Sequence, residues 1–337
     1  MKIERKMAAT ALFVALSAAG VVASAQTVRI ANQGDSLSMD PHSLNESLQL
    51  TVTGNVYEPL VGRNKDLSLT PMLATSWKQT SPTVWRFELR KGVQFHDGTP
   101  FTADDVVFSL ARTQVEGSDM KSYTNDFKEV RKINDYTVEI ETKAPFPILP
   151  DVISLVYIMS KKWCETNQAT RPVDRRKGVE NAASFRANGT GPYRLRERQP
   201  NVRTTFVRNG NYWGKIEGNV VNVEYTPIGN DSTRVAALLS GQVDVIEPVP
   251  LQDVDAAIVE LEHAVKVLKL SGVEIGTNIN GTVIGDPKLE PFFAAAQDLD
   301  MKLSLHSLTS RRADSDPGKA DMLYRAVRGI SNIINST

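Results

Sequence analysis

The chain has 337 residues, with 39 basic and 39 acidic side chains and a hydrophobic content of 41%. This length allows two domains and the apolar content is enough for a real core, whereas the balanced charge excludes a basic stripe for nucleic acid and an acidic disordered tail. The only cysteine is Cys164, so no internal disulfide can form, and its simplest role is that of a buried, inert side chain.

Residues 1–25 have the features of a cleavable signal peptide. Three basic residues precede an apolar stretch over 7–22, and Ala23-Ser24-Ala25 is a small-residue cleavage site. The alternative is an N-terminal membrane anchor, but the apolar stretch is short for a spanning helix. We therefore expect cleavage before Gln26 and export of a soluble protein. No cysteine lies near the site, so a lipid anchor is not indicated.

From Thr27 to Ile246 the sequence mixes strand and helix patterns without an internal repeat. The patterns predict strands over 27–32, 85–90, 136–141, 193–198, 203–208, 220–225 and 243–246. They predict helices over 43–57 and 234–240, a short turn or helix over 69–77, a buried helix or strand over 148–159, and a loop with a short helix over 170–187. This mixture favours an α/β or α+β fold with a mixed sheet.

The stretch from Phe95 to Leu110 contains the clearest local signals in the chain. His96-Asp97-Gly98 predicts a turn, because Asp bonds its own backbone and Gly accepts positive φ. Thr102 is a candidate N-cap, and the Asp105 carboxylate can reach back to it. An apolar helical face follows, so we expect a strand–turn–helix junction.

The same stretch resembles the segment FxDGxPxTAxDVxFS of the family 5 solute-binding proteins, which are the peptide- and nickel-binding proteins of bacterial ABC importers. Other family signatures follow in the same order along the chain. They are an LDP-like turn at 38–41, a helix exit at 57–60, PxLAxSW over 71–77, GTGPY at 189–193, NxxYW over 209–213 and ALxxGxxD ending at Asp244. One such match would be weak evidence, but this many in order indicate membership strongly.

The resemblance implies a fold and a function. Residues 26–254 would form the first lobe of a type II-like periplasmic binding protein, with a subdomain inserted at about 46–184. The family's proteins trap ligand between two lobes, and the closed form docks on a membrane permease. The chain would then be a periplasmic monomer that captures a small solute, above all a peptide, and delivers it to an ABC permease in the inner membrane, with no cofactor and no nucleic acid.

The resemblance also implies where ligand binds. Leu44, Asn45, Glu46 and Ser47 match the ligand-facing stretch of the first lobe. Asn45 and Ser47 would offer hydrogen bonds to a ligand's backbone. The alternative is that they only cap the following helix, since Asn45 is an ordinary N-cap residue, and the sequence leaves both interpretations open. The residues that choose the solute would lie mostly in the second lobe.

The C-terminal part of the chain resembles something else. Residues 257–306 look like an internal piece of the amidohydrolase-type metal-dependent barrels related to aminocarboxymuconate-semialdehyde decarboxylase, with helices at 257–268 and 287–299 and strands at 272–277 and 302–306. We expect this βα fragment over 255–310, a junction near 254–258, and an unassigned tail over 311–337. The chain would then be a truncated, fused binding protein with impaired binding.

The candidates for catalytic chemistry are few. The four histidines are His42, His96, His263 and His306, and none belongs to a paired metal motif. His306 matches a metal ligand of the amidohydrolase family, but a metal site needs three or four converging ligands. No GxSxG motif frames a nucleophile. We therefore expect no metal site, no catalytic residues and no enzyme. Alternatives are an amidohydrolase- or decarboxylase-like enzyme resting on 257–306, and a non-functional fusion product.

Overall fold

The computed structural model describes residues 26–64, 66–216, 218–247, 254–266, 272–276, 278–279 and 282–306. The predicted signal peptide and the tail over 311–337 lie outside these ranges. Within them, no helix combines the length and the apolar character that crossing a membrane requires.

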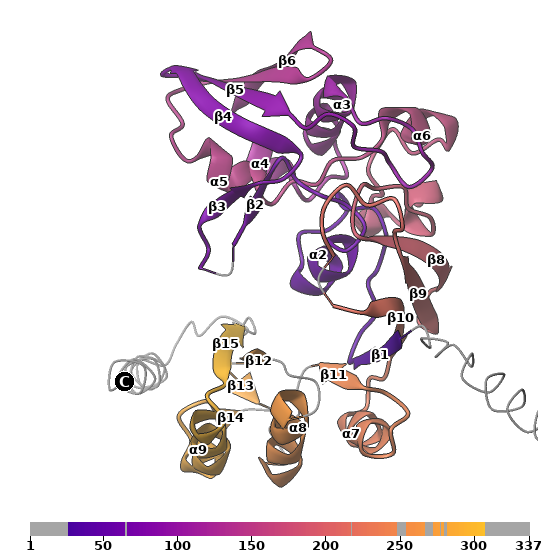
Figure 1. The fold of residues 1–337 in the computed structure, drawn as a ribbon, viewed down its shortest axis with the longest axis vertical. Coiled ribbons are helices and arrows are strands. Elements are labelled where there is room, and N and C mark those ends of the chain that lie inside the picture. Colours follow the sequence, from indigo (N-terminus) through magenta and orange to yellow (C-terminus); the bar gives the residue numbers. More distant parts are fainter. Residues whose placement is uncertain are drawn as a thin grey trace, which may run out of the picture.

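A five-stranded mixed sheet is built from two distant parts of the chain (Figure 1). Its order is β11-β1-β10-β9-β8. β1 (Gln26–Asn32) runs parallel to both β10 (Val220–Pro227) and β11 (Val245–Glu247). β9 (Arg203–Arg208) and β8 (Tyr193–Gln199) continue the sheet in antiparallel pairs. The chain leaves this sheet after β1 and returns to it at β8. Residues 33–192 therefore form an insertion between two strands of one sheet, hereafter the excursion.

The excursion contains a four-stranded antiparallel sheet of order β4-β5-β7-β6. Its strands are β4 (Ala74–Ser81), β5 (Val84–Leu89), β6 (Phe127–Asn134) and β7 (Thr137–Thr142). α3 (Ala103–Thr113) packs on β6 and β7 (Figure 1). Phe87, Val138 and Ile140 from the sheet and Val106 and Leu110 from α3 are buried in one cluster. The alternating sequence of β5 thus places its apolar side chains against this helix.

Smaller elements complete the excursion. They are α2 (Ser47–Thr53), the hairpin of β2 (Val61–Arg63) and β3 (Leu69–Pro71), α4 (Lys121–Thr124), α5 (Leu149–Ile153), α6 (Lys161–Thr166), and the 3-10 turns η1 (Arg175–Lys177) and η2 (Ala182–Ser184). A second apolar cluster joins α2 to the five-stranded sheet, with Val52 and Val56 against Phe206 and Tyr225.

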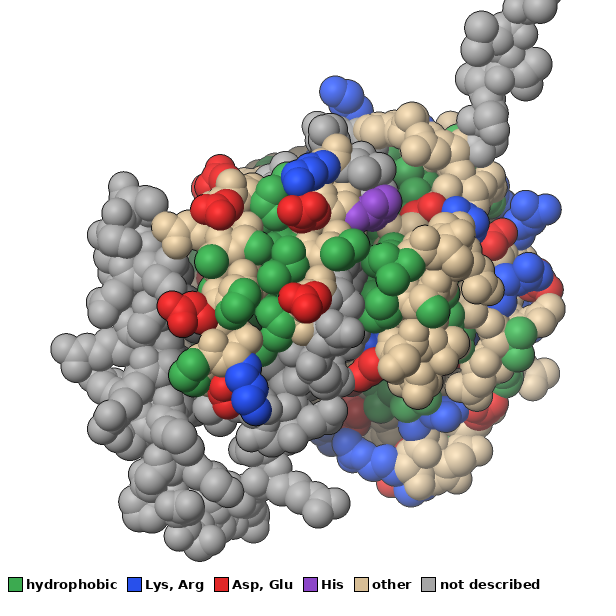
Figure 2. Space-filling model, turned by 90° about the horizontal axis from the view of Figure 1, so that it is seen from below, with side chains coloured by type: hydrophobic (Ala, Val, Ile, Leu, Met, Phe, Trp, Pro, Cys, Tyr) green, Lys and Arg blue, Asp and Glu red, His purple; other side chains and the backbone are tan. Residues whose placement is uncertain are grey.

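A row of helices runs along the bottom of Figure 1, below the strands. α7 (Asp231–Leu239) packs on β1 and β11 through Ala237, Ala31 and Ile246. Next come α8 (Val254–Lys266), η3 (Pro287–Leu289) and α9 (Glu290–Asp298), with parallel β12 (Gly272–Gly276) and β15 (Lys302–His306) and the short antiparallel pair β13 (Asn278–Ile279) and β14 (Thr282–Val283). Figure 2 shows hydrophobic side chains gathered on this lower face, where Leu239 and Val259 are 64% and 50% exposed.

Most predicted elements are confirmed, and the mixed α/β fold with them. α3 begins directly after Thr102, whose backbone amide donates to the Asp105 carboxylate at 2.9 Å, as the capping pattern predicts. The turn or helix expected over 69–77 is wrong, because β3 and the first half of β4 are extended there. The helix expected over 43–57 covers only Ser47–Thr53, because the residues before it form a polar turn and not a helix.

Candidate functional site

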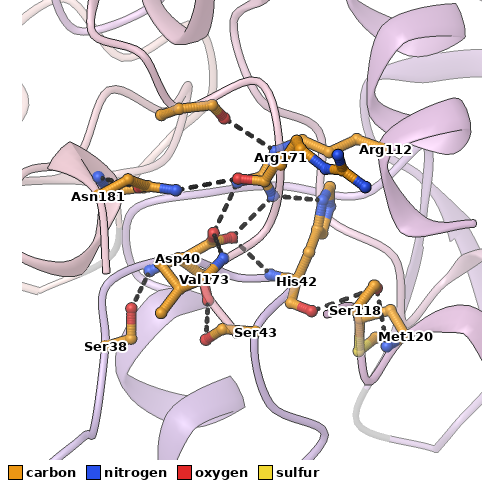
Figure 3. Close-up of polar contacts among 12 residues, drawn as sticks. Ser38, Asp40, His42, Ser43, Arg112, Ser118, Met120, Arg171, Val173 and Asn181 are labelled. Atoms are coloured by element: carbon orange, nitrogen blue, oxygen red, sulfur yellow. Dashed lines mark hydrogen bonds and ion pairs between the residues drawn. The ribbon is translucent and has the colours of Figure 1, made fainter. Parts of the chain in front are cut away.

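A buried ion pair holds the turn that follows β1 (Figure 3). The Arg112 guanidinium, on α3, donates to the Asp40 carboxylate at 2.6 and 2.8 Å, and both side chains are fully buried. Arg112 also donates to the backbone carbonyls of Ala169 at 3.1 Å and Arg171 at 2.9 Å. The family-like turn at 38–41 is thus tied to a helix seventy-two residues further along the chain.

Both oxygens of the Asp40 carboxylate accept hydrogen bonds. Besides Arg112, the backbone amides of His42 and Val173 donate to it, each at 3.0 Å. Burial alone would raise the pKa of Asp40, but the charge and hydrogen bonds of Arg112 outweigh it and hold the pKa below its usual value. Asp40 is therefore a charged residue in a dry site, and its bonds fix the turn rather than leaving it free for a ligand.

His42 lies between the same guanidinium and a backbone carbonyl. Its Nδ1 is 3.0 Å from Arg112 Nη1, and its Nε2 is 2.8 Å from the carbonyl oxygen of Tyr157. Because an arginine can only donate, Nδ1 must accept and Nε2 must carry the proton. The carbonyl of His42 in turn accepts from the Asp119 amide and the Ser118 hydroxyl, both at 3.2 Å. His42 therefore links the turn to the segment before α4.

α2 is attached to this turn by one amide side chain. Gln49 Nε2 donates to the Asp40 carbonyl at 2.9 Å and the Ser43 hydroxyl at 3.2 Å, while its Oε1 accepts from the Ser38 amide at 3.2 Å. Glu46 caps the helix, accepting from the amides of Leu48 and Gln49. The cap is therefore Glu46, and not Asn45 as the capping alternative expected.

The four predicted ligand-facing residues lie together at the start of α2. Leu44 is half-buried, and Asn45, Glu46 and Ser47 are exposed. The Asn45 amide is 3.1–3.2 Å from the hydroxyl of Tyr123 on α4. Tyr123 was not predicted, and no sequence signal could have found it, because a four-residue helix carries no periodic pattern. The structure therefore adds one polar aromatic group to the candidate site.

This segment lies near the carboxyl ends of the parallel strands. Burial raises the pKa of Tyr225 at the end of β10, and the charges of Asp35, Glu247 and Glu46 raise it further. The Tyr225 hydroxyl donates to the Gly34 carbonyl at 2.6 Å, directly after β1. In open α/β sheets, ligands bind outside the carboxyl ends of such strands. Residues 44–47 and Tyr123 together form an exposed polar surface near this edge of the sheet, hereafter the polar wall.

A second buried carboxylate connects several of the family-like signatures. Glu58, at the exit from α2, accepts from the Tyr212 hydroxyl, the Trp213 indole N–H and the Thr190 hydroxyl, each at 2.7 Å. Burial raises its pKa above the usual value, although the three donors act in the opposite direction. The signatures at 57–60, 189–193 and 209–213 therefore meet at one carboxylate, which holds the excursion against β8 and β9.

The described residues offer little support for metal binding or for a reactive thiol. Among the residues that the structure describes, no group of three or more His, Cys, Asp or Glu could hold a metal. Burial raises the pKa of the Cys164 thiol to about 12, so it is inert, as predicted. The His306 side chain lies outside the described residues. A groove of about 420 Å³ on the four-stranded sheet is lined by Thr75, Glu88, Leu89, Lys91, Asn134, Tyr136 and Thr137, none of them from the polar wall.

Comparisons with known proteins agree with this architecture. Residues 68–289 match the model of the bacterial extracellular solute-binding proteins, family 5 Middle. The glutathione-binding protein GsiB of Pectobacterium atrosepticum is 28% identical over 256 residues, covering 75% of this chain and 48% of the relative. The periplasmic murein peptide-binding protein MppA of Escherichia coli is 26% identical over 236 residues, covering 63% and 42%.

A solved structure supports the fold. The oligopeptide-binding protein AppA of Bacillus subtilis, in complex with a nonapeptide, superposes with a TM-score of 0.60 at 22% identity, over 70% of this chain and 46% of AppA. The chain thus spans about half the length of the relatives it matches.

The same match corrects one expectation. The family model continues to residue 289, across the expected junction at 254–258 and into the stretch that resembled an amidohydrolase. The amidohydrolase resemblance is therefore not borne out, and the relatives described above are binding proteins rather than enzymes. The chain belongs to family 5 of the bacterial extracellular solute-binding proteins.

Proposed function

We propose that this chain is the substrate-binding component of an ABC importer, which captures a peptide-class solute in the periplasm and delivers it to a permease in the inner membrane. The observation that carries the proposal is the polar wall, an exposed segment held by a fully bonded buried network at the carboxyl ends of parallel strands. The relatives' names support the solute class, since they bind glutathione, a murein peptide and an oligopeptide.

The wall suits the backbone of a peptide. The amide of Asn45 can both donate and accept, and the hydroxyls of Ser47 and Tyr123 can do either. A peptide backbone presents alternating N–H and C=O groups, so such groups recognise it independently of its side chains. Leu44 would contribute apolar contact, and Glu46 would favour a ligand amino group once its helix-capping bonds are satisfied.

The proposed organisation follows the family. Residues 26–254 form the first lobe, with an inserted subdomain over about 46–184, and the protein acts as a monomer exported by its cleaved signal peptide. Residues 255–289 fall within the family match, which supports treating them as part of the binding protein. A ligand trapped between lobes needs both walls. The chain spans about half the length of these relatives, and the polar wall would supply the first lobe's side of that site.

A titration with glutathione and short peptides, followed by both NMR and calorimetry, tests the proposal. We expect saturable amide shift changes at 44–47 and Tyr123, with a dissociation constant that agrees with the calorimetric one. Asn45→Ala should abolish those changes, whereas Asn55→Ala, at an exposed position just past the other end of α2, should not. No shift change at the wall with any peptide would contradict the function.

A further inference from the structure

His42 lies at the junction of the two segments that make the polar wall. One segment, Ser43–Ser47, follows it directly along the chain. The other, which leads into α4 and Tyr123, donates to its carbonyl from the Asp119 amide and from the Ser118 hydroxyl, both at 3.2 Å. Figure 3 shows the Ser118 contact. The wall has Asn45 and Tyr123 side by side, and His42 is joined to both of the segments that carry them.

The bonds of the imidazole ring permit only its neutral form. Arg112 Nη1 points an N–H at Nδ1 from 3.0 Å, so a proton on Nδ1 would face a proton on the guanidinium. On the other side, Nε2–H is already used by the Tyr157 carbonyl at 2.8 Å. The ring is fully buried, so no water can take over either contact. Adding a proton therefore requires the ring and Arg112 to separate.

We propose that neutral His42 is a positioning residue for the polar wall, and that protonation of its Nδ1 separates segment 43–47 from the turn that carries Tyr123. This inference rests on the proposed function in one respect only, namely that the separation would weaken ligand binding at the wall. The opening itself is a property of the free protein and can be measured without any ligand.

The other titratable groups around His42 do not change charge in the same range. Asp40 stays ionised because its pKa is held low, and Arg112 stays protonated. Burial raises the pKa of Cys164 to about 12 and that of Tyr57 still further, so both stay neutral. The Asp119 carboxylate points to Arg176 at 2.5 Å rather than to the ring. His42 is therefore the group in this cluster that responds to mild acid.

The direction of the effect follows from the shift. Burial lowers the pKa of His42 to about 4, and the charge of Arg112 adds to this. In an opened state the ring would regain its ordinary pKa of about 6.5. The His42 contribution to closure is thus complete above pH 6.5 and is lost as the pH falls toward 4. By linkage, the open population should rise roughly twenty-fold between pH 7 and pH 5.

Hydrogen exchange of the mature chain tests this proposal. After correction for intrinsic rates, we expect protection of the Asp119 amide, and of the His42 and Val173 amides bonded to Asp40, to fall about twenty-fold from pH 7 to pH 5. His42→Gln should remove this dependence, because its amide can accept from Arg112 and donate to Tyr157 without titrating. Any peptide shift changes at the wall should weaken below pH 5 in the unsubstituted protein and not in this variant.

The chain provides a matched control. His96 is also buried with a pKa lowered to about 4, but its Nε2 bonds the Gly191 carbonyl at 3.0 Å and it has no contact with the wall. His96→Gln should leave the pH dependence around His42 intact. Protection that does not change with pH, or an imidazole that NMR shows titrating near 6.5 in the folded protein, overturns the proposal even if His42→Gln fails to fold. Absence of peptide binding would contradict the proposed function alone.

Discussion

Arg112→Met should destabilise the protein by roughly 4 kcal/mol, because it leaves the Asp40 carboxylate buried without its countercharge. The substitution keeps the apolar length of the side chain but removes all five N–H donors, and the structure uses them on Asp40, His42 and two backbone carbonyls. Urea unfolding of the two proteins at pH 7 measures the difference.

Arg63→Met is the matched control. Arg63 pairs with Asp151 at 3.1 Å, but the two side chains are 35% and 47% exposed. Water replaces the lost partner there, so the cost should stay below about 1 kcal/mol. Equal losses in the two variants would show that the Asp40–Arg112 pair does not organise the turn after β1.

Glu58→Ala should have an effect of similar size, again roughly 4 kcal/mol. It leaves three donors without their acceptor, namely the Tyr212 and Thr190 hydroxyls and the Trp213 indole N–H. Each unsatisfied buried donor costs about 1–3 kcal/mol, and a cavity remains as well. The loss should appear in thermal unfolding, and it should alter Trp213 fluorescence in the folded state, since the indole loses its charged partner.

Glu88→Ala provides the comparison for Glu58. Glu88 lies on β5 and is exposed, although its carboxylate also accepts a hydrogen bond, from the Thr137 hydroxyl at 2.7 Å. Its removal should cost less than about 1 kcal/mol. A Glu58→Ala variant as stable as Glu88→Ala would mean that the three signatures do not depend on the carboxylate at which they meet.

Much of the fold could be predicted from the sequence because local patterns carry it. The alternation in β5 and β7 and the capped start of α3 were identified from single stretches. β3 and β4 were missed because their extended form comes from pairing with β2 and β5 rather than from their own alternation. α7 begins three residues earlier than predicted, because Asn230 caps it by accepting from the Thr233 amide at 2.9 Å.

Only part of the candidate site could be predicted from the sequence. Residues 44–47 could be proposed from the family resemblance, but the partners that fix them come from far along the chain. In the sequence, Arg112 is only one basic residue in the last turn of a helix, and Tyr123 is only one aromatic residue in a polar stretch. Only the fold shows that Arg112 is buried against Asp40 and that the hydroxyl of Tyr123 meets Asn45.

The amidohydrolase resemblance failed for a related reason. Alternating βα units of similar length occur in many α/β proteins, so a helix–strand–helix–strand pattern specifies little about family. The parallel pair β12–β15 with α8 and α9 is such a unit. Signatures that meet at one buried group, as at Glu58, are more specific, because each residue must satisfy the same contact.

The central claim is that ligand lies against the polar wall, and photo-cross-linking tests it most directly. A tripeptide with a central photoreactive side chain would be irradiated with the protein at pH 7, and the attachment sites would be identified by peptide mass spectrometry. The account predicts attachment within 44–47 and at Tyr123, reduced by excess unlabelled peptide. Attachment confined to the groove around Glu88, Lys91 and Tyr136 on the four-stranded sheet, equally competed, would contradict it.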